Sequence, residues 1–334
     1  MRERLLLAVF SMTFLLVVAE MGLRVIGVRP LNVRSVSKAD FNRVPGMYEP
    51  GLDVTAHKIP ELPHEIHVNA FGFRGPETTL VPDRPRVVCI GDSFMWGDGV
   101  NDNETLPAQL ERLFDGEVEF LNGGVAGSTI QDQRPFLERL LVMQPDAVLL
   151  LYSENDLMDM LADPSFSERL VQARDARSGM SGLVYSLVRG TAVVELALRA
   201  REAWRSRQLV ERFNTEVSSL HWNDELLESY TNEVSEMHAQ LEALGIRLLV
   251  VAFPWPHYVT TDEDGSIPPL VESLQKADIE VVNLTRPLRQ SNLDEKELYL
   301  LPYDGHPAAK GYAVVAAAIE PHYRQLFGTG SPLP

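Results

Sequence analysis

The chain has 334 residues, of which 45% are hydrophobic and 23% are charged, and its formal net charge is −17 at pH 7. This composition predicts a globular protein with a sizeable core. The acidic excess argues against binding nucleic acid or anionic lipid through charge, and the single cysteine, Cys89, excludes an internal disulfide and a thiolate metal site.

The N-terminal segment, residues 1–28, is predicted to be a membrane helix. It begins with two arginines, continues with an uncharged run over residues 5–19, and carries Glu20 and Arg24 four residues apart. A helix over residues 5–28 is about 36 Å long, which crosses a hydrocarbon core of about 30 Å, and the two charges can pair near the interface. We favour an uncleaved anchor, with a cleaved signal peptide as the alternative. In both cases the two arginines stay inside, so the rest of the chain lies outside the cytoplasm.

Residues 29–83 are predicted to form an extended tether, because proline and glycine are scattered through them without a sustained hydrophobic period. Three histidines in this segment are interpreted as surface loop residues rather than metal ligands, since no carboxylate cluster accompanies them. They are His57, His64 and His67. Arg74, in the motif GFRG, is interpreted as a surface or packing residue rather than a substrate ligand.

From residue 86 onward, short apolar runs alternate with helical stretches. The runs are rich in Val, Ile and Leu, which is typical of strands buried on both faces. The predicted strands are 86–90, 118–122, 146–152, 247–253 and 279–284. The predicted helices are 105–114, 128–144, 226–244, 267–277 and 307–327. This alternation predicts an α/β fold with three α/β/α layers around a mainly parallel, five-stranded, flavodoxin-like sheet, in which Cys89 is a buried thiol.

Residues 157–225 interrupt the alternation. They contain helix-like stretches and no strand pattern, so a helical insertion that covers the site is predicted. The chain is therefore divided into an anchor or signal segment over 1–28, a tether over 29–83 and a catalytic domain over 84–330 that contains the insertion.

Polar and glycine-rich motifs follow four of the predicted strands, at the sheet edge where ligands bind in such folds. Ser93 follows the first strand, Gly127 lies in the glycine-rich stretch after the second, and Asn155 follows the third. Asp304 and His306 stand between the fifth strand and the last helix. A serine nucleophile needs a base, a group that orients the base, and donors for the oxyanion. These residues supply each of those parts.

The four motifs, GDSFMWGDGV, NGGVAGSTIQDQ, SEND and DGHPAAKGY, resemble the four blocks of the SGNH (GDSL-type) hydrolases and occur in the same order. The resemblance covers residues 84 to about 156 and 226–327. It implies that Ser93 is the nucleophile and His306 the base. It also implies an oxyanion hole formed by the N–H groups of Ser93 and Gly127 and the side chain of Asn155. The N-terminal helix and the motif NAFGFRG are similar to a membrane-anchored bacterial subgroup.

The chain departs from the family pattern at the acid. The family usually has Asp-x-x-His, but Tyr303 stands three residues before His306 and Asp304 only two before. Asp304 is predicted to orient the histidine, with a backbone carbonyl as the alternative. Ser153 replaces the usual glycine of the third block, and Asp92 is interpreted as structural.

The sequence therefore predicts an extracytoplasmic, membrane-anchored serine esterase that cleaves a carboxylic ester through Ser93, His306 and Asp304. An acetyl ester on a glycan or a lipid ester is the expected substrate class, and no metal or cofactor and no nucleic acid partner is expected. One alternative is an O-acyltransferase that acts on cell-surface polysaccharide. The other is a glycan- or lipid-binding module without catalysis, which only the short Asp-x-His spacing favours.

Overall fold

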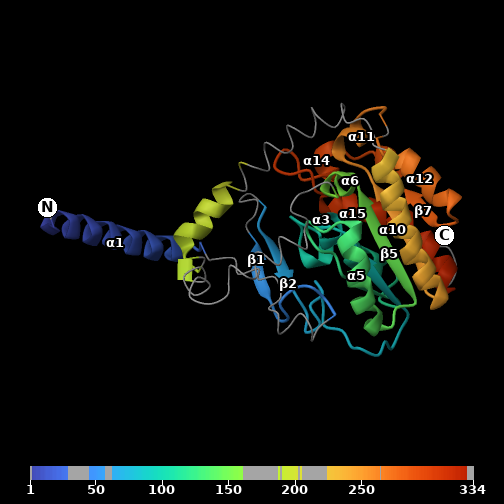
Figure 1. Ribbon diagram of the computed structural model, residues 1–334, viewed down its shortest axis with the longest axis horizontal. Helices are drawn as coiled ribbons and strands as arrows, with labels where there is room; N and C mark the ends of the chain where they lie inside the picture. The colour runs from blue at the N-terminus through green and yellow to red at the C-terminus, as the bar shows by residue number, and fades with distance from the viewer. Residues whose placement is uncertain are drawn as a thin grey trace.

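The computed structural model describes residues 2–28, 45–56, 62–160, 187–188, 190–201, 204, 224–263 and 265–328 (Figure 1). Within these ranges one five-stranded parallel sheet has the order β4-β3-β5-β6-β7. Its strands are β3 (Arg86–Ile90), β4 (Glu119–Asn122), β5 (Ala147–Ser153), β6 (Arg247–Phe253) and β7 (Glu280–Asn283). This is the flavodoxin-like order, so the predicted sheet is confirmed.

Helices cover both faces of the sheet, because alternate residues of each strand point to opposite faces. In β3, Val87 and Cys89 join the core on one face, while Val88 and Ile90 join the core on the other. The first face carries α4 (Leu106–Leu113), α13 (Thr285–Arg289) and α15 (Ala309–Phe327). The second carries α5 (Ile130–Leu140), α10 (Asp224–Ala243) and α12 (Ile267–Lys276). The three-layer prediction is confirmed, and burial raises the pKa of the Cys89 thiol well above its ordinary value.

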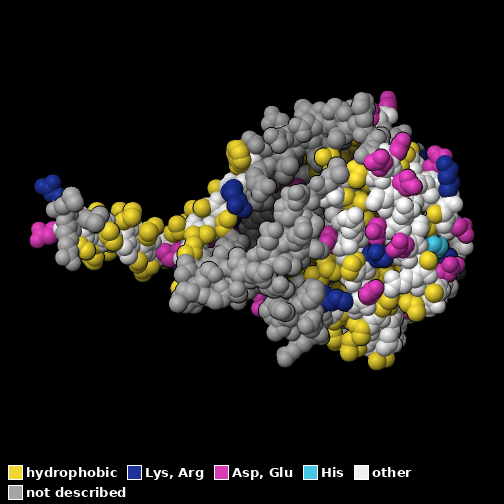
Figure 2. All heavy atoms as spheres, viewed as in Figure 1, with side chains coloured by type: hydrophobic (Ala, Val, Ile, Leu, Met, Phe, Trp, Pro, Cys, Tyr) yellow, Lys and Arg dark blue, Asp and Glu magenta, His cyan; other side chains and the backbone are white. Residues whose placement is uncertain are grey.

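The N-terminal helix α1 (Arg2–Val25) projects away from the layers as a rod of apolar side chains (Figure 2). Its window over Leu6–Val25 is apolar and long enough to cross a membrane, and none of that window is buried. The predicted pair forms near its end, where Arg24 Nε lies 2.6 Å from Glu20 Oε1. Of the predicted insertion, residues 157–159, 187–188, 192–201, 204 and 224–225 are helical, and residues 161–186, 189, 202–203 and 205–223 lie outside the described part of the chain.

The segment between α1 and the sheet packs on the domain through an antiparallel ribbon, β1 (Asp53–Ala56) and β2 (His64–His67). Apolar residues of the ribbon form a small core with Trp96, and the Tyr48 ring stacks on Trp96 with centroids 3.8 Å apart.

The histidine predictions for this segment are partly wrong. His64 is buried in strand β2 rather than exposed in a loop. Its Nε2 accepts a hydrogen bond from the N–H of Gly99 at 3.4 Å. His67 is partly exposed, and His57 lies outside the described residues. Among the residues described, no group of three or more His, Cys, Asp or Glu side chains is arranged to hold a metal ion.

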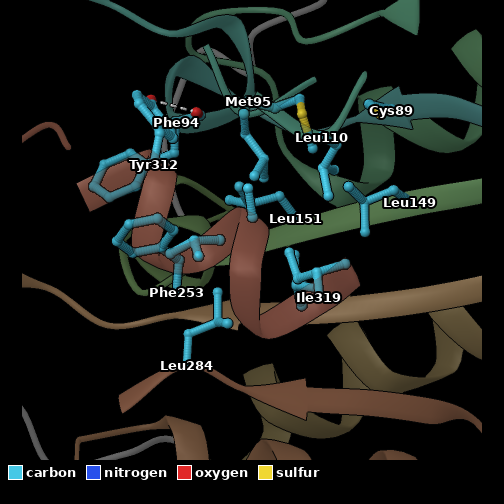
Figure 3. Close-up of a cluster of buried hydrophobic side chains, with 14 of the residues drawn as sticks. Cys89, Phe94, Met95, Leu110, Leu149, Leu151, Phe253, Leu284, Tyr312 and Ile319 are labelled. Atoms are coloured by element: carbon cyan, nitrogen blue, oxygen red, sulfur yellow. Dashed lines mark hydrogen bonds between the residues drawn. The ribbon is translucent and has the colours of Figure 1, made fainter. Parts of the chain in front are cut away.

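The core beneath the end of β3 supports a short helix, α3 (Ser93–Trp96) (Figure 3). Phe94 and Met95 of this helix are buried beside Leu151 of β5, and the Tyr312 hydroxyl of α15 donates to the Phe94 carbonyl at 2.6 Å. A helix of four residues has no stability of its own. Tertiary packing therefore determines where Ser93 lies.

Candidate active site

Ser93, His306 and Asp304 form one hydrogen-bonded line at the carboxyl edge of the sheet. His306 Nε2 lies 2.7 Å from Ser93 Oγ, and His306 Nδ1 lies 2.5 Å from Asp304 Oδ1. The backbone N–H of His306 donates to the same carboxylate oxygen at 3.2 Å. This bond closes an Asx turn, which explains how a carboxylate only two residues before the histidine reaches Nδ1. The structure thus brings together the three residues that the sequence selected, despite the short spacing.

Asp92 fixes the start of α3. Its Oδ1 accepts the N–H of Phe94 at 2.9 Å, as an N-cap residue does, and its Oδ2 accepts Asn155 Nδ2 at 2.9 Å. The Ser93 hydroxyl lies 3.5 Å from that same Oδ2. Asp92 is fully buried, so these donors replace the hydrogen bonds that its carboxylate would make with water. Its role in the structure is the structural one that the sequence indicated.

Asn155 lies beside Ser93, since both side chains reach the same oxygen of Asp92. Its Nδ2 also donates to Asp159 Oδ2 at 3.0 Å, so carboxylates accept both of its N–H bonds. Its Oδ1 lies 2.5 Å from Ser153 Oγ, at the position where the family usually has glycine. Asn155 was expected at this edge from the sequence, but neither carboxylate contact was. Asp92 lies 63 residues away in the chain, whereas the i,i+4 spacing of Asp159 was a local signal that could have indicated the second contact.

The loop after β4 lies against α3 and is held from both sides. A Cβ at Gly124 would lie 2.3 Å from the backbone nitrogen of Trp96, so only glycine fits there. The N–H of Ala126 donates to the Tyr48 hydroxyl at 3.1 Å. Gly127 follows directly, with φ +80°. Thr129 then begins α5, where its N–H donates to Asp132 at 3.0 Å.

A known family matches the part of the chain that contains this site. The model of the GDSL-like lipase/acylhydrolase family matches residues 89–314, a range that contains all five predicted site residues. The chain belongs to the GDSL-like lipase/acylhydrolase family. It is therefore a hydrolase that acts on ester bonds.

Solved structures with a similar fold include three low-identity neighbours. A protein described as lipolytic and of the G-D-S-L family from Desulfitobacterium hafniense is 16% identical, with a TM-score of 0.42, over 71% of this chain and 99% of that one. The acetylxylan esterase Axe2 from Geobacillus stearothermophilus is 12% identical, with a TM-score of 0.43, over 74% and 95%. A GDSL-like lipase from Bacteroides thetaiotaomicron is 12% identical, with a TM-score of 0.40, over 72% and 88%. No curated protein matches the chain.

Arg74 connects the GDSL-like domain to the segment that precedes the family match. Its guanidinium is buried, with Nε 2.7 Å from Asp102 Oδ1 and its carbon 5.2 Å from the centre of the Trp96 ring. Its other donors bind the backbone carbonyls of Glu65, Trp96, Gly97 and Val100 at 2.6–3.0 Å. The arginine is thus a packing residue, one of the two roles expected from the sequence, and it holds the C-terminal end of the helix that Ser93 begins.

Glu154 is a buried carboxylate beside Asn155 that sequence analysis missed. Its Oε2 accepts the N–H of Trp255 at 2.9 Å, and its Oε1 accepts the N–H of Ser266 at 3.0 Å. Burial raises the pKa of Glu154 to about 7, although these hydrogen bonds favour the charged form. The Trp255 ring then packs against Gly305, the residue between Asp304 and His306. Glu154 therefore supports the surface on which the histidine loop lies.

Glu154→Gln is expected to change how stability depends on pH. In the wild type the folded protein keeps a proton on Glu154 up to about pH 7, while the unfolded chain releases it near its ordinary pKa of 4.5. This group therefore lowers the free energy of unfolding by up to about 3 kcal/mol as the pH rises from 4.5 to 7. Glutamine has no such proton, so urea unfolding at about pH 5 and about pH 8 should show a smaller fall in the variant. Equal falls would contradict the burial of a titrating carboxyl group.

Gly305→Ala is expected to lower kcat by about 10²-fold, because a displacement of about 1 Å at reacting groups has that effect. The added Cβ would lie 2.4 Å from Trp255 Cζ2, so the loop that carries His306 must move. Steady-state ester hydrolysis measures the loss. Since a smaller ring removes the clash, the double variant Gly305→Ala, Trp255→Phe should regain part of the rate. No recovery would show that the indole contact is not the cause.

Proposed function

We propose that the chain is a serine esterase in which Ser93 attacks the carbonyl carbon of a carboxylic ester, His306 is the general base and Asp304 orients His306. The observation that supports this proposal is the line Ser93 Oγ–His306 Nε2–Asp304, with distances of 2.7 and 2.5 Å. A serine hydroxyl becomes nucleophilic when an adjacent base accepts its proton, and the base in turn needs a partner for its other nitrogen.

In the proposed reaction, the Ser93 proton moves to His306 Nε2 while Oγ bonds to the ester carbon. The tetrahedral intermediate expels the alcohol, which takes the proton from His306, and an acyl-enzyme remains. Water then donates its proton to His306 and attacks the acyl carbon, which releases the carboxylic acid and regenerates the hydroxyl of Ser93. Asp304 keeps Nδ1 protonated, so that Nε2 accepts in both steps.

We assign the oxyanion to the N–H groups of Ser93 and Gly127 and to the side chain of Asn155. In the structure the Asn155 amide donates to Asp92 and Asp159. The proposal therefore includes an exchange in which the N–H on Asp159 turns to the oxyanion, while the bond to Asp92 holds the amide in place. The acceptor of this N–H changes from the Asp159 carboxylate to the oxyanion. Both acceptors are negatively charged, so the hydrogen bond stays charge-assisted.

We further propose that α1 anchors the enzyme in a membrane and that the catalytic domain, residues 84–330, lies outside the cytoplasm. We also propose that residues 157–225 form a helical insertion in this domain. The apolar window of α1 supports the anchor, and a cleaved signal peptide is the alternative. Basic residues lie in the first turn of α1 at Arg2 and Arg4, but also near its end at Arg24 and beyond it at Arg29. Labelling an introduced cysteine from either side of the membrane therefore decides the orientation.

The function is tested with p-nitrophenyl acetate and butyrate and with a serine-directed fluorophosphonate. Hydrolysis of either ester, together with covalent labelling mapped to Ser93, supports the proposal. The ratio of the two rates reports the acyl length that the pocket accepts. Labelling without hydrolysis, followed by acyl transfer when a polysaccharide acceptor is added, would indicate an O-acyltransferase instead. Absence of both labelling and turnover in folded protein would refute the serine mechanism.

A further inference from the structure

The helical residues 192–201 and 204, which we call the inverted helix, bury a charged pair and expose large apolar side chains, with Ala192 buried beside the pair and Arg201 exposed. Glu195 and Arg199 form an ion pair at 2.9 Å whose side chains are only 7% and 12% exposed. Leu196 and Trp204, by contrast, are 45% and 61% exposed, and the exposed Ala200 lies between them at a spacing of four. A helix in water turns its apolar stripe inward, so this stripe faces a medium or partner that is itself apolar.

The N-terminal end of the inverted helix lies on the last turns of α1. The N–H of Val193 donates to Glu20 Oε2 at 3.1 Å, and Arg24 Nη2 donates to the carbonyl of Gly190 at 2.9 Å. Together with the Glu20–Arg24 pair, these bonds provide partners for both charges that α1 carries near its end. Charges near a membrane span need such partners. The contact places the inverted helix where a spanning helix would leave the hydrocarbon.

Glu20 stands five residues before the end of α1, which is about 7 Å along the helix axis. Amphipathic helices that lie in a membrane interface bury their apolar face by about 5–10 Å, so the first turn of the inverted helix, at Val193, lies within that range of depth. Tryptophan is enriched at this level, because its ring is apolar and its N–H is polar. Leu187, which precedes the inverted helix in the chain, is also 66% exposed. Figure 2 shows that the apolar surface of α1 continues onto this segment, which is yellow-green in Figure 1.

We propose that the inverted helix is a second membrane-binding element, which inserts Leu196, Ala200 and Trp204 into the leaflet at which α1 ends. The inference rests on the proposed membrane anchoring and adds to it. Apolar burial rather than charge attraction is the driving force, in keeping with a net charge of −17. A bilayer is favoured over a second protein copy because the apolar stripe is continuous with the apolar surface of α1.

The experiment uses the full chain in liposomes, with an environment-sensitive fluorophore on one introduced cysteine and nitroxide-labelled lipids as quenchers. The native Cys89 is fully buried, so the thiol reagent does not reach it. The probe positions are Leu196→Cys on the inverted helix, Leu15→Cys near the middle of α1, and Lys276→Cys on α12, where the lysine side chain is 72% exposed. Each labelled variant must retain ester hydrolysis, which shows that it is folded.

The Leu196 probe should be quenched most by nitroxides near the headgroup, the Leu15 probe by nitroxides near the chain end, and the Lys276 probe by neither. Quenching at Leu15 without quenching at Leu196 overturns this inference and leaves the anchor intact. Disulfide cross-linking of the unlabelled Leu196→Cys variant under oxidising conditions, without lipid quenching of the labelled one, also overturns it, in favour of a second copy. If neither the Leu15 nor the Leu196 probe is quenched, the proposed anchor fails as well.

Discussion

Ser93→Ala and His306→Ala are each expected to lower kcat for p-nitrophenyl acetate by about 10⁴- to 10⁶-fold, because removing the nucleophile or the base removes the acyl-enzyme path as a whole. The double variant should lose no more than either single variant, since the two side chains act as one unit through their 2.7 Å hydrogen bond. Fluorophosphonate labelling should disappear in both single variants. KM should change little, because neither side chain is expected to contribute to binding of the substrate in its ground state.

Matched controls for these variants are Ser273→Ala on α12 and His322→Ala on α15. They remove a serine hydroxyl and an imidazole that lie outside the line of Ser93, His306 and Asp304. Both should keep the wild-type kcat within about twofold, as surface substitutions away from the site do. Asp304→Asn should lose about 10²- to 10⁴-fold, because histidine then loses the partner that fixes its tautomer. Wild-type kcat in Asp304→Asn would assign the orienting role to another acceptor. More than a tenth of the wild-type rate in Ser93→Ala would exclude Ser93 as nucleophile.

Arg74→Met is expected to lower the free energy of unfolding by about 3–5 kcal/mol, the usual effect of removing one partner of a buried ion pair. The variant keeps most of the side-chain volume but removes the guanidinium donors of Asp102 and of the carbonyls of Trp96, Gly97 and Val100. Asp102 then keeps the N–H of His67, and the carbonyls of Trp96 and Gly97 keep only longer bonds of 3.2 and 3.4 Å. Since two of these carbonyls end the helix that Ser93 begins, kcat should fall together with stability. Chemical denaturation and ester hydrolysis measure the two effects.

The matched control is Arg84→Met. Arg84 also pairs with a carboxylate, Glu111 at 2.9 Å, and binds the carbonyl of Gly116, but its side chain is 36% exposed. Surface ion pairs contribute about 0–1 kcal/mol, so this variant should unfold within about 1 kcal/mol of the wild type. Similar destabilisation in both variants would show that the burial of Arg74 does not account for its effect on the free energy of unfolding.

The sheet was predictable because burial on both faces leaves a direct trace in the sequence. The run RVVCI coincides with β3, and RLLVVAF coincides with β6. The helix of residues 226–244 was predicted to begin too late, since Asp224 and Glu225, which are polar and exposed, already belong to α10 in the described residues. Helix α3 was not predicted, because four residues carry no period and its formation depends on Asp92 and the core below it.

The residues of the proposed triad could be selected from the sequence, because Ser93 follows the predicted end of β3 and the motif with Asp304 and His306 precedes the predicted last helix. The contacts that support them could not. Glu154 and Trp255 are 101 residues apart, and Tyr48 meets Ala126 across 78 residues. Such contacts arise from packing between elements and have no local pattern. The exchanged polarity of the inverted helix was equally hidden, because periodicity shows that a helix has two faces but not which face is turned outward.

The hydrogen bond between Ser93 and His306 joins residues 213 positions apart. During synthesis at about 5–20 residues per second, roughly 10–40 seconds separate the appearance of the serine from that of the histidine. The strand that positions the serine pairs with β4 and β5, all made early, whereas α15 is made last and supplies Tyr312, which fixes Phe94. If Ser93 is the nucleophile, as we propose, the nascent chain therefore holds an inert serine after its N-terminal helix has been made. Under this proposal, reactivity arises only at the end of biogenesis, when the last helix docks.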